Sequence, residues 1–159
     1  MSSPFQHLKM DRELACELLG VFARFEFALK ARGYALGDGS RVNPDWDRFA
    51  KAITPQFDRN ADREFATAVQ YLLTQPPKKQ ILNGRKLEWC DAPPDGNQCK
   101  AKQVLLMVRR VRNNLFHGGK FSEDTSSSPN RDSSLVENSL VVLRTCLVLN
   151  GDVAAAYNN

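Results

Sequence analysis

Apolar residues recur every three or four positions along five separate segments of this chain, and this spacing constrains the fold more than any other feature. Such spacing places the apolar side chains on one face of an α-helix, and that face must be buried against other elements. The segments are 8–32, 46–54, 61–74, 98–116 and 135–149. We therefore predict an all-α protein, a bundle of about five helices.

Turn-forming residues separate the first helices from one another. Residues 33–41 contain Gly37-Asp38-Gly39-Ser40 and are expected to form a turn-rich connector. Asn43-Pro44-Asp45 is a favourable helix start, because it offers a capping side chain and an early proline. Pro55 is expected to end the second helix, since proline disrupts a helix interior.

Two later stretches do not follow the helical period. Residues 75–98 carry Asn83-Gly84 between apolar flanks, which predicts a small β-hairpin or an extended insertion. Residues 122–134 are polar and are expected to form a loop. Because 159 residues suit one hydrophobic core, the range 1–159 is expected to be a single domain.

The expected last helix, 135–149, is apolar around most of its circumference. Such a wide arc exceeds a single packing face. The helix is therefore expected to be central in the bundle or to cover a subunit interface as well.

Composition indicates an ordinary globular protein, with 42% hydrophobic and 25% charged residues. The sequence has no long apolar run and begins without the pattern of a secretory signal, so we expect a cytoplasmic protein. Cys16 and Cys146 lie in predicted helices and are expected to act as small buried residues. Cys90 and Cys99 flank a loop and are within reach of each other, although disulfides are uncommon in the cytosol. The cysteines lack the close spacing that is typical of a zinc site. We therefore expect neither a metal nor another cofactor.

Positive charge is concentrated in one part of the chain. The net charge is +4 with a pI of about 9.0, but residues 96–122 contain no acidic residue at all. A basic stretch attracts polyanions such as RNA. The alternative is a solvated helix face that is balanced by acids on neighbouring helices. Besides Arg112, the basic side chains are Lys100, Lys102, Arg109, Arg110 and Lys120.

The run Arg112-Asn113-Asn114-Leu115-Phe116-His117 ends the fourth predicted helix, just before Gly118-Gly119. It places a cation and a proton-transfer group at one helix end, a combination that suits catalysis at a phosphate group. Each residue also has a plainer interpretation. A histidine near a helix C-terminus often only compensates the helix dipole, and an arginine on a helix flank usually forms an ion pair.

A step of five residues separates Arg112 from His117 by about 140° around a helix, so the two side chains do not share one face. Unwinding at Gly118-Gly119 would bring them together, and so would a two-fold dimer in which one site draws on both chains. We favour the dimer, because the last helix has surplus apolar surface.

Residues 111–119 resemble the R-x(4–6)-H motif of HEPN domains, in which a polar residue follows the arginine as Asn113 does here. HEPN domains are helical bundles that carry this motif near the end of a late helix. Residues 22–30 and the insertion at 76–89 are similar to those of stand-alone bacterial or plasmid-borne HEPN proteins. The resemblance implies a metal-independent ribonuclease, usually dimeric, that often serves as a toxin or as an anti-phage or stress effector, with an antitoxin or other partner protein.

In such an enzyme the ribose 2′-OH attacks the neighbouring phosphorus and expels the 5′-oxygen, which leaves a 2′,3′-cyclic phosphate. His117 would be the general acid and base, because histidine exchanges protons near neutral pH. Arg112 would stabilise the charged phosphorane, Asn113 would orient the imidazole or the phosphate, and Glu26 would pair with Arg112. The RNA backbone would be held by Lys100, Lys102, Arg109, Arg110 and Lys120.

Two other interpretations fit the same residues. One is a catalytically inactive helical module that binds RNA, a nucleotide or a partner protein through the basic helix. The other is a structural dimer with Arg112 and His117 at its interface. Substitution of these two residues separates the three. It should abolish turnover in a ribonuclease, whereas an inactive module should bind without cleavage and His117→Ala should leave that binding unaffected. In a structural dimer the substitutions should change the oligomeric state and the stability.

Overall fold

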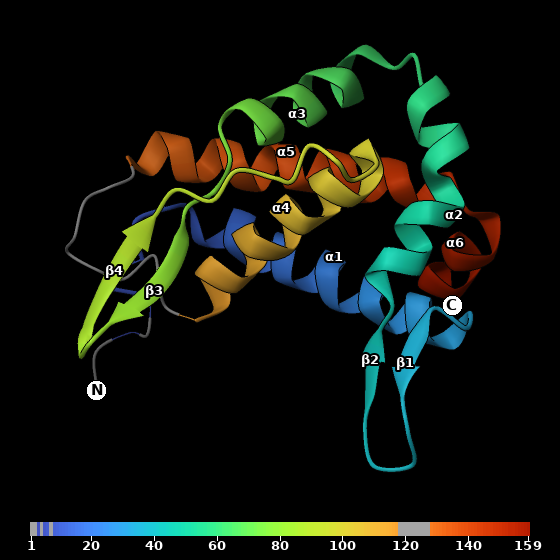
Figure 1. Cartoon of the computed structure of the whole chain (residues 1–159), viewed down its shortest axis with the longest axis horizontal. Coiled ribbons are helices and arrows are strands. Elements are labelled where there is room, and N and C mark those ends of the chain that lie inside the picture. The colour runs from blue at the N-terminus through green and yellow to red at the C-terminus, as the bar shows by residue number, and fades with distance from the viewer. Residues whose placement is uncertain (1–2, 4, 7, 118–127) are drawn as a thin grey trace.

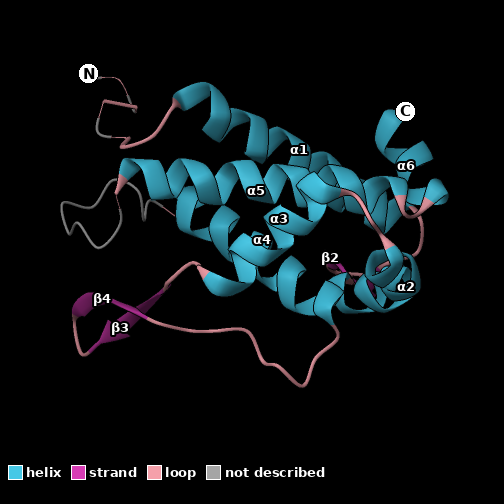
Figure 2. Ribbon diagram, turned by 90° about the horizontal axis from the view of Figure 1, so that it is seen from above, coloured by secondary structure: helices cyan, strands magenta, loops and turns pink. Residues whose placement is uncertain are grey.

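The computed structural model describes residues 3, 5–6, 8–117 and 128–159. This part of the chain is mostly helical, with six helices and two small antiparallel hairpins (Figures 1 and 2). The helices are α1 (Arg12–Ala31), α2 (Trp46–Arg59), α3 (Arg63–Thr74), α4 (Lys100–Phe116), α5 (Pro129–Val148) and α6 (Gly151–Asn158). The strands are β1 (Ala35–Gly37), β2 (Val42–Pro44), β3 (Lys79–Asn83) and β4 (Lys86–Cys90).

The predicted helical architecture is confirmed, and so is the hairpin within 75–98. Strands β3 and β4 pair in antiparallel register, with Asn83 opposite Lys86. The turn between them has Gly84 and Arg85 as its central residues, and Gly84 has a φ of +62°. Glycine suits that position because a left-handed φ there matches the twist of the two strands.

The expected connector at 33–41 instead contains the start of a second hairpin, formed by β1 and β2. Its tight approach depends on Gly37, which has a φ of +152°. A Cβ atom at Gly37 would lie 2.0 Å from the carbonyl oxygen of Arg41. The predicted turn is therefore present at these residues, but it joins two short strands that the sequence analysis did not predict.

The expected end of the second helix before Pro55 was wrong, since α2 continues to Arg59. The residues beyond the proline are held by tertiary packing. Phe57 is buried, and its ring makes an edge-on contact with Phe65 of α3 at 4.9 Å. This burial offsets the backbone hydrogen bond that proline cannot donate.

Helix α5 begins earlier in the chain than the sequence predicted. Helix α5 begins at Pro129, so 129–134 is helical, while 122–127 lies outside the described residues. The side chain of Ser128 caps α5 by accepting from the N–H of Arg131.

The sequence also gave no expectation of α6, a sixth helix that Asn150 caps. Its position is held by Arg24 of α1, which donates to the carbonyl oxygen of Tyr157 and lies over the Tyr157 ring.

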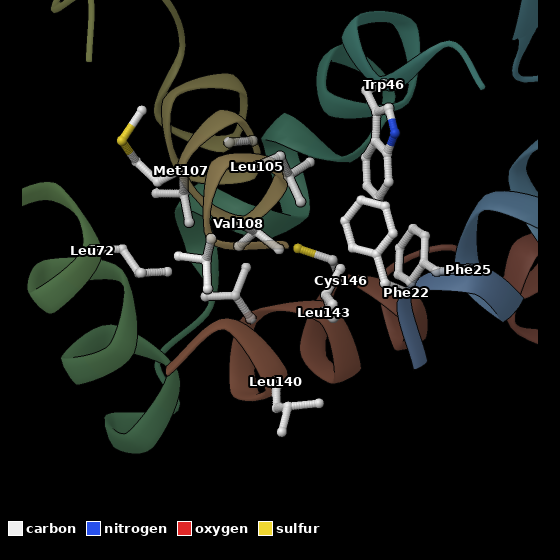
Figure 3. Packing of buried hydrophobic residues seen from close by; sticks show 14 of the residues in the cluster. Phe22, Phe25, Trp46, Leu72, Leu105, Met107, Val108, Leu140, Leu143 and Cys146 are labelled. Carbon is white, nitrogen blue, oxygen red and sulfur yellow. The ribbon is translucent and has the colours of Figure 1, made fainter. Parts of the chain in front are cut away.

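Helix α5 is central in the bundle, as one of the two alternatives for an apolar last helix predicted. It packs against α1, α3, α4 and α6. Figure 3 shows Leu143 and Cys146 of α5 beside residues of the neighbouring helices. Burial raises the pKa of the Cys146 thiol, so this cysteine behaves as an apolar core residue. Cys16 lies in α1 as expected, but it is exposed rather than buried.

Within the described ranges, no single helix is both long and apolar enough to cross a membrane. Only α5 and α6 taken together meet that length and composition, and the chain bends by 111° between them.

Candidate functional site

The candidate site is built on the C-terminal end of α4, which contacts α1, α2, α3, α5 and β3. Val104, Val108 and Val111 are buried and fix this helix in the core. His117 caps the helix, and its backbone N–H donates to the carbonyl oxygen of Asn113 at 2.9 Å. Its imidazole is exposed. The expected unwinding at Gly118-Gly119 falls outside the described residues.

Arg112 lies against α1 and not toward open solvent. Its Nη2 is 3.2 Å from Oε1 of Glu26, so the pair expected from the sequence is present. The Arg112 guanidinium also lies over the Phe22 ring, at 4.5 Å from its centroid. Each of the two charged side chains is only 24% exposed, which strengthens their attraction relative to a surface pair. The Nε of Arg112 is buried and has no hydrogen-bond partner.

Trp46 of α2 completes the support of Arg112, a role that the sequence analysis did not predict. Its Nε1–H donates to the same Oε1 atom of Glu26 at 3.2 Å. The indole ring is fixed in turn by Phe22 and Phe25, at 5.2 and 5.3 Å between ring centroids. Figure 3 shows these three aromatic rings close to one another. Glu26 therefore accepts from two donors whose positions are set by separate helices.

An open hollow of about 580 Å³ lies on the other side of this helix end, between α4 and β3. Asn113 and His117 line it from α4, and Lys79 and Gln80 line it from β3. Arg109 also faces this hollow, whose other lining residues are Leu106, Arg110 and Asn114. An imidazole, an amide and cationic groups around one hollow can bind an anion and transfer a proton. Lys79 and Gln80 were missed because they precede α4 by about 20 residues and carry no motif.

Arg110 and Asn114 attach the β3–β4 hairpin to α4 and thereby form the wall of the hollow. The Nη1 atom of Arg110 donates to the carbonyl oxygens of Pro77 and Ala92, which lie before β3 and after β4. Asn114 Nδ2 donates to the carbonyl oxygen of Lys78 at 2.8 Å. Burial lowers the pKa of the Arg110 guanidinium. The contacts of Arg110 are thus structural, whereas the sequence had suggested an RNA contact.

The remaining predicted RNA-binding residues do not gather at the hollow. Lys102 forms an ion pair with Asp47 of α2 at 2.8 Å. Lys100 lines a different hollow between α2 and α3, at the opposite end of α4. Lys120 lies outside the described residues. Of the five cations named from the sequence, Arg109 and Arg110 border the hollow beside His117.

Arg112 and His117 face different surroundings within one chain. Arg112 contacts Glu26 and Phe22 of α1, while His117 lines the hollow beside β3. This arrangement agrees with the separation of about 140° expected from their spacing.

All four cysteines are free in the structure, and no group of three or more His, Cys, Asp or Glu side chains able to hold a metal occurs in the part of the chain that it describes. Comparison with known proteins found no matching family, no matching curated protein and no matching solved structure.

Proposed function

We propose that this protein is a metal-independent endoribonuclease of the HEPN type. The observation that carries the proposal is the exposed His117 in a hollow with Asn113 and two cationic side chains, Lys79 and Arg109. The helical fold, with the R-x(4)-H sequence at the end of a late helix, is compatible with that family. A cytoplasmic toxin or an anti-phage or stress effector, with RNA as substrate and an antitoxin or other partner, is the corresponding biological role.

The proposed reaction is transesterification within the RNA. A base, His117, takes the proton of the 2′-OH, and the 2′-oxygen bonds to phosphorus while the 5′-oxygen leaves and takes up a proton. The products are a 2′,3′-cyclic phosphate and a 5′-OH end. Arg112 contributes positive charge to the phosphorane and Asn113 orients the imidazole or a phosphate oxygen. Glu26 fixes the Arg112 guanidinium through the ion pair at 3.2 Å.

A dimer is part of this proposal. In one chain Arg112 and His117 lie on different sides of α4, so joint action on one phosphate requires groups from two chains. In a two-fold arrangement the two His117 side chains can also divide the base and acid roles.

The test is cleavage of single-stranded and structured RNA by the purified protein in the presence of EDTA. We expect 5′-OH and cyclic-phosphate ends, and no cleavage where the ribose is 2′-deoxy. His117→Ala and Arg112→Ala should abolish cleavage. His117 is exposed, so its substitution leaves the core intact, and Arg112→Lys provides a milder variant at the partly buried position.

A matched control is Arg32→Ala, which removes an exposed arginine after α1, away from the hollow. Its activity should equal that of the original protein. Cleavage that survives both His117→Ala and Arg112→Ala would overturn the proposed function.

One observation favours a second candidate, an inactive module that binds RNA, a nucleotide or a partner protein. Arg112 is already paired with Glu26 and is only 24% exposed, as expected of a structural arginine. For such a module, RNA or partner binding would occur without cleavage, and His117→Ala would leave that binding unchanged.

A further inference from the structure

Arg109 is placed between Arg112, which pairs with Glu26, and His117, which lines the hollow. Its guanidinium is over the Trp46 ring, at 6.0 Å from the centroid. Trp46 in turn donates a hydrogen bond to Glu26, the partner of Arg112. Arg109 also lines the hollow that contains Asn113 and His117. Around the axis of α4 it is about 60° from Arg112 and about 80° from His117, on the arc between them.

The three arginines at this end of α4 differ in the donors that they leave available. Arg110 donates to two backbone carbonyls of the hairpin, and Arg112 donates to Glu26. Within the described residues, Arg109 makes the contact with the Trp46 ring and no hydrogen bond or ion pair. The N–H donors of its guanidinium are therefore available to a ligand.

The Trp46 ring is the contact of the Arg109 guanidinium that the structure shows. The ring is itself fixed by the Phe22 and Phe25 rings and by the hydrogen bond to Glu26. A cation over such a ring is attracted to its face without using any N–H donor. Glu26 is already paired with Arg112, so that carboxylate is engaged by a different arginine.

From this geometry we infer that Arg109 is a catalytic residue of the site, which binds the reacting phosphate directly beside His117. The inference rests on the proposed ribonuclease function and adds a role to it. A preorganised guanidinium stabilises the extra negative charge of the phosphorane, so its effect belongs to the chemical step as well as to binding. Residues that only hold the RNA backbone away from the reacting phosphate affect binding alone.

The experiment compares steady-state cleavage by Arg109→Gln, Arg109→Lys and the control Arg32→Gln. We expect Arg109→Gln to lower kcat about 100-fold with an unchanged melting temperature, because one preorganised transition-state contact is lost. Arg109→Lys should recover part of kcat by restoring charge without the planar fork. Arg32→Gln should behave as the original protein. A raised KM at unchanged kcat, or no change in either, would overturn the inference.

A binding measurement separates failure of this inference from failure of the proposed function. The probe is a single-stranded 2′-O-methyl RNA of about 12 nucleotides, which cannot react because its attacking hydroxyl is blocked. Loss of the Arg109 charge should weaken binding and reduce the slope of log affinity against log salt by about 1. If the original protein cleaves no RNA, the proposed function and the catalytic role of Arg109 both fall. Unchanged probe binding by Arg109→Gln would then also exclude Arg109 from any phosphate site in the hollow.

Discussion

At the scale of single residues, Glu26 connects the candidate site to the core. One carboxylate oxygen accepts both from Arg112 Nη2 and from Trp46 Nε1, each at 3.2 Å. These two donors come from α4 and α2, while Glu26 is on α1. The contact therefore holds three helices in one relative position and sets the direction of the Arg112 guanidinium.

We predict that Glu26→Gln lowers the free energy of unfolding by about 1–3 kcal/mol, because it leaves a partly buried arginine without a counter-charge. Urea denaturation measures this loss. The matched control is Glu17→Gln, on the same helix, which removes an exposed ion pair with Arg144 and should cost less than about 1 kcal/mol. Equal losses for the two variants would show that the Glu26 pair is no stronger than a surface pair.

At the scale of elements, the β3–β4 hairpin depends on α4 for its position. A two-stranded hairpin is marginally stable by itself. Arg110 donates hydrogen bonds to carbonyl oxygens before β3 and after β4, and Asn114 donates one to the carbonyl oxygen of the residue just before β3. In Figure 1 the hairpin projects beside the C-terminal end of α4, so these bonds determine the wall of the hollow.

Arg110→Ala should release the hairpin from α4 while the six helices remain folded. Losing two bonds to backbone carbonyls is expected to cost about 1–3 kcal/mol and to open the hairpin locally. Hydrogen exchange of the amides in Lys79–Asn83 and Lys86–Cys90 should become faster, with little change in α1 and α5. The neighbouring Arg109→Ala is the control, since Arg109 has no bond to the hairpin. Similar exchange in both variants would contradict the anchoring role of Arg110.

At the scale of the whole molecule, the proposed chemistry requires two copies of the chain. Arg112 is directed to α1 and His117 to the hollow beside β3, so one chain does not bring them together. Exposed apolar side chains near this region are available for a second copy to cover. Phe116, next to His117, is 65% exposed, and the cross-strand pair Leu82 and Leu87 is 66% and 61% exposed.

A mixture of two inactive proteins tests this arrangement. If each site takes Arg112 from one chain and His117 from the other, Arg112→Ala and His117→Ala chains together form mixed dimers with one intact site. After subunit exchange, an equal mixture should regain about a quarter of the original activity, because about half of the dimers are mixed. RNA cleavage and light scattering are measured on the same samples. Mixed dimers without any recovered activity, or a monomeric active protein, would exclude a shared site.

The sequence was sufficient for features that depend on local interactions. Apolar residues at helical spacing predicted the helical fold, and Asn83-Gly84 predicted the hairpin near residue 84. The angle between Arg112 and His117 also followed from spacing alone.

Tertiary structure decided the features that depend on residues distant in sequence. Helix α2 continues beyond Pro55 because Phe57 is buried against Phe65, and α6 is held by Arg24. Five basic residues besides Arg112 received the same expected role from the sequence, and their neighbours in space are what distinguish them. Arg110 donates to carbonyl oxygens of the hairpin segment and Arg112 pairs with Glu26, while Arg109 lines the hollow beside His117 without a hydrogen bond among the described residues. Charge is a property of each residue, whereas the availability of that charge depends on which distant groups the fold brings within hydrogen-bonding distance.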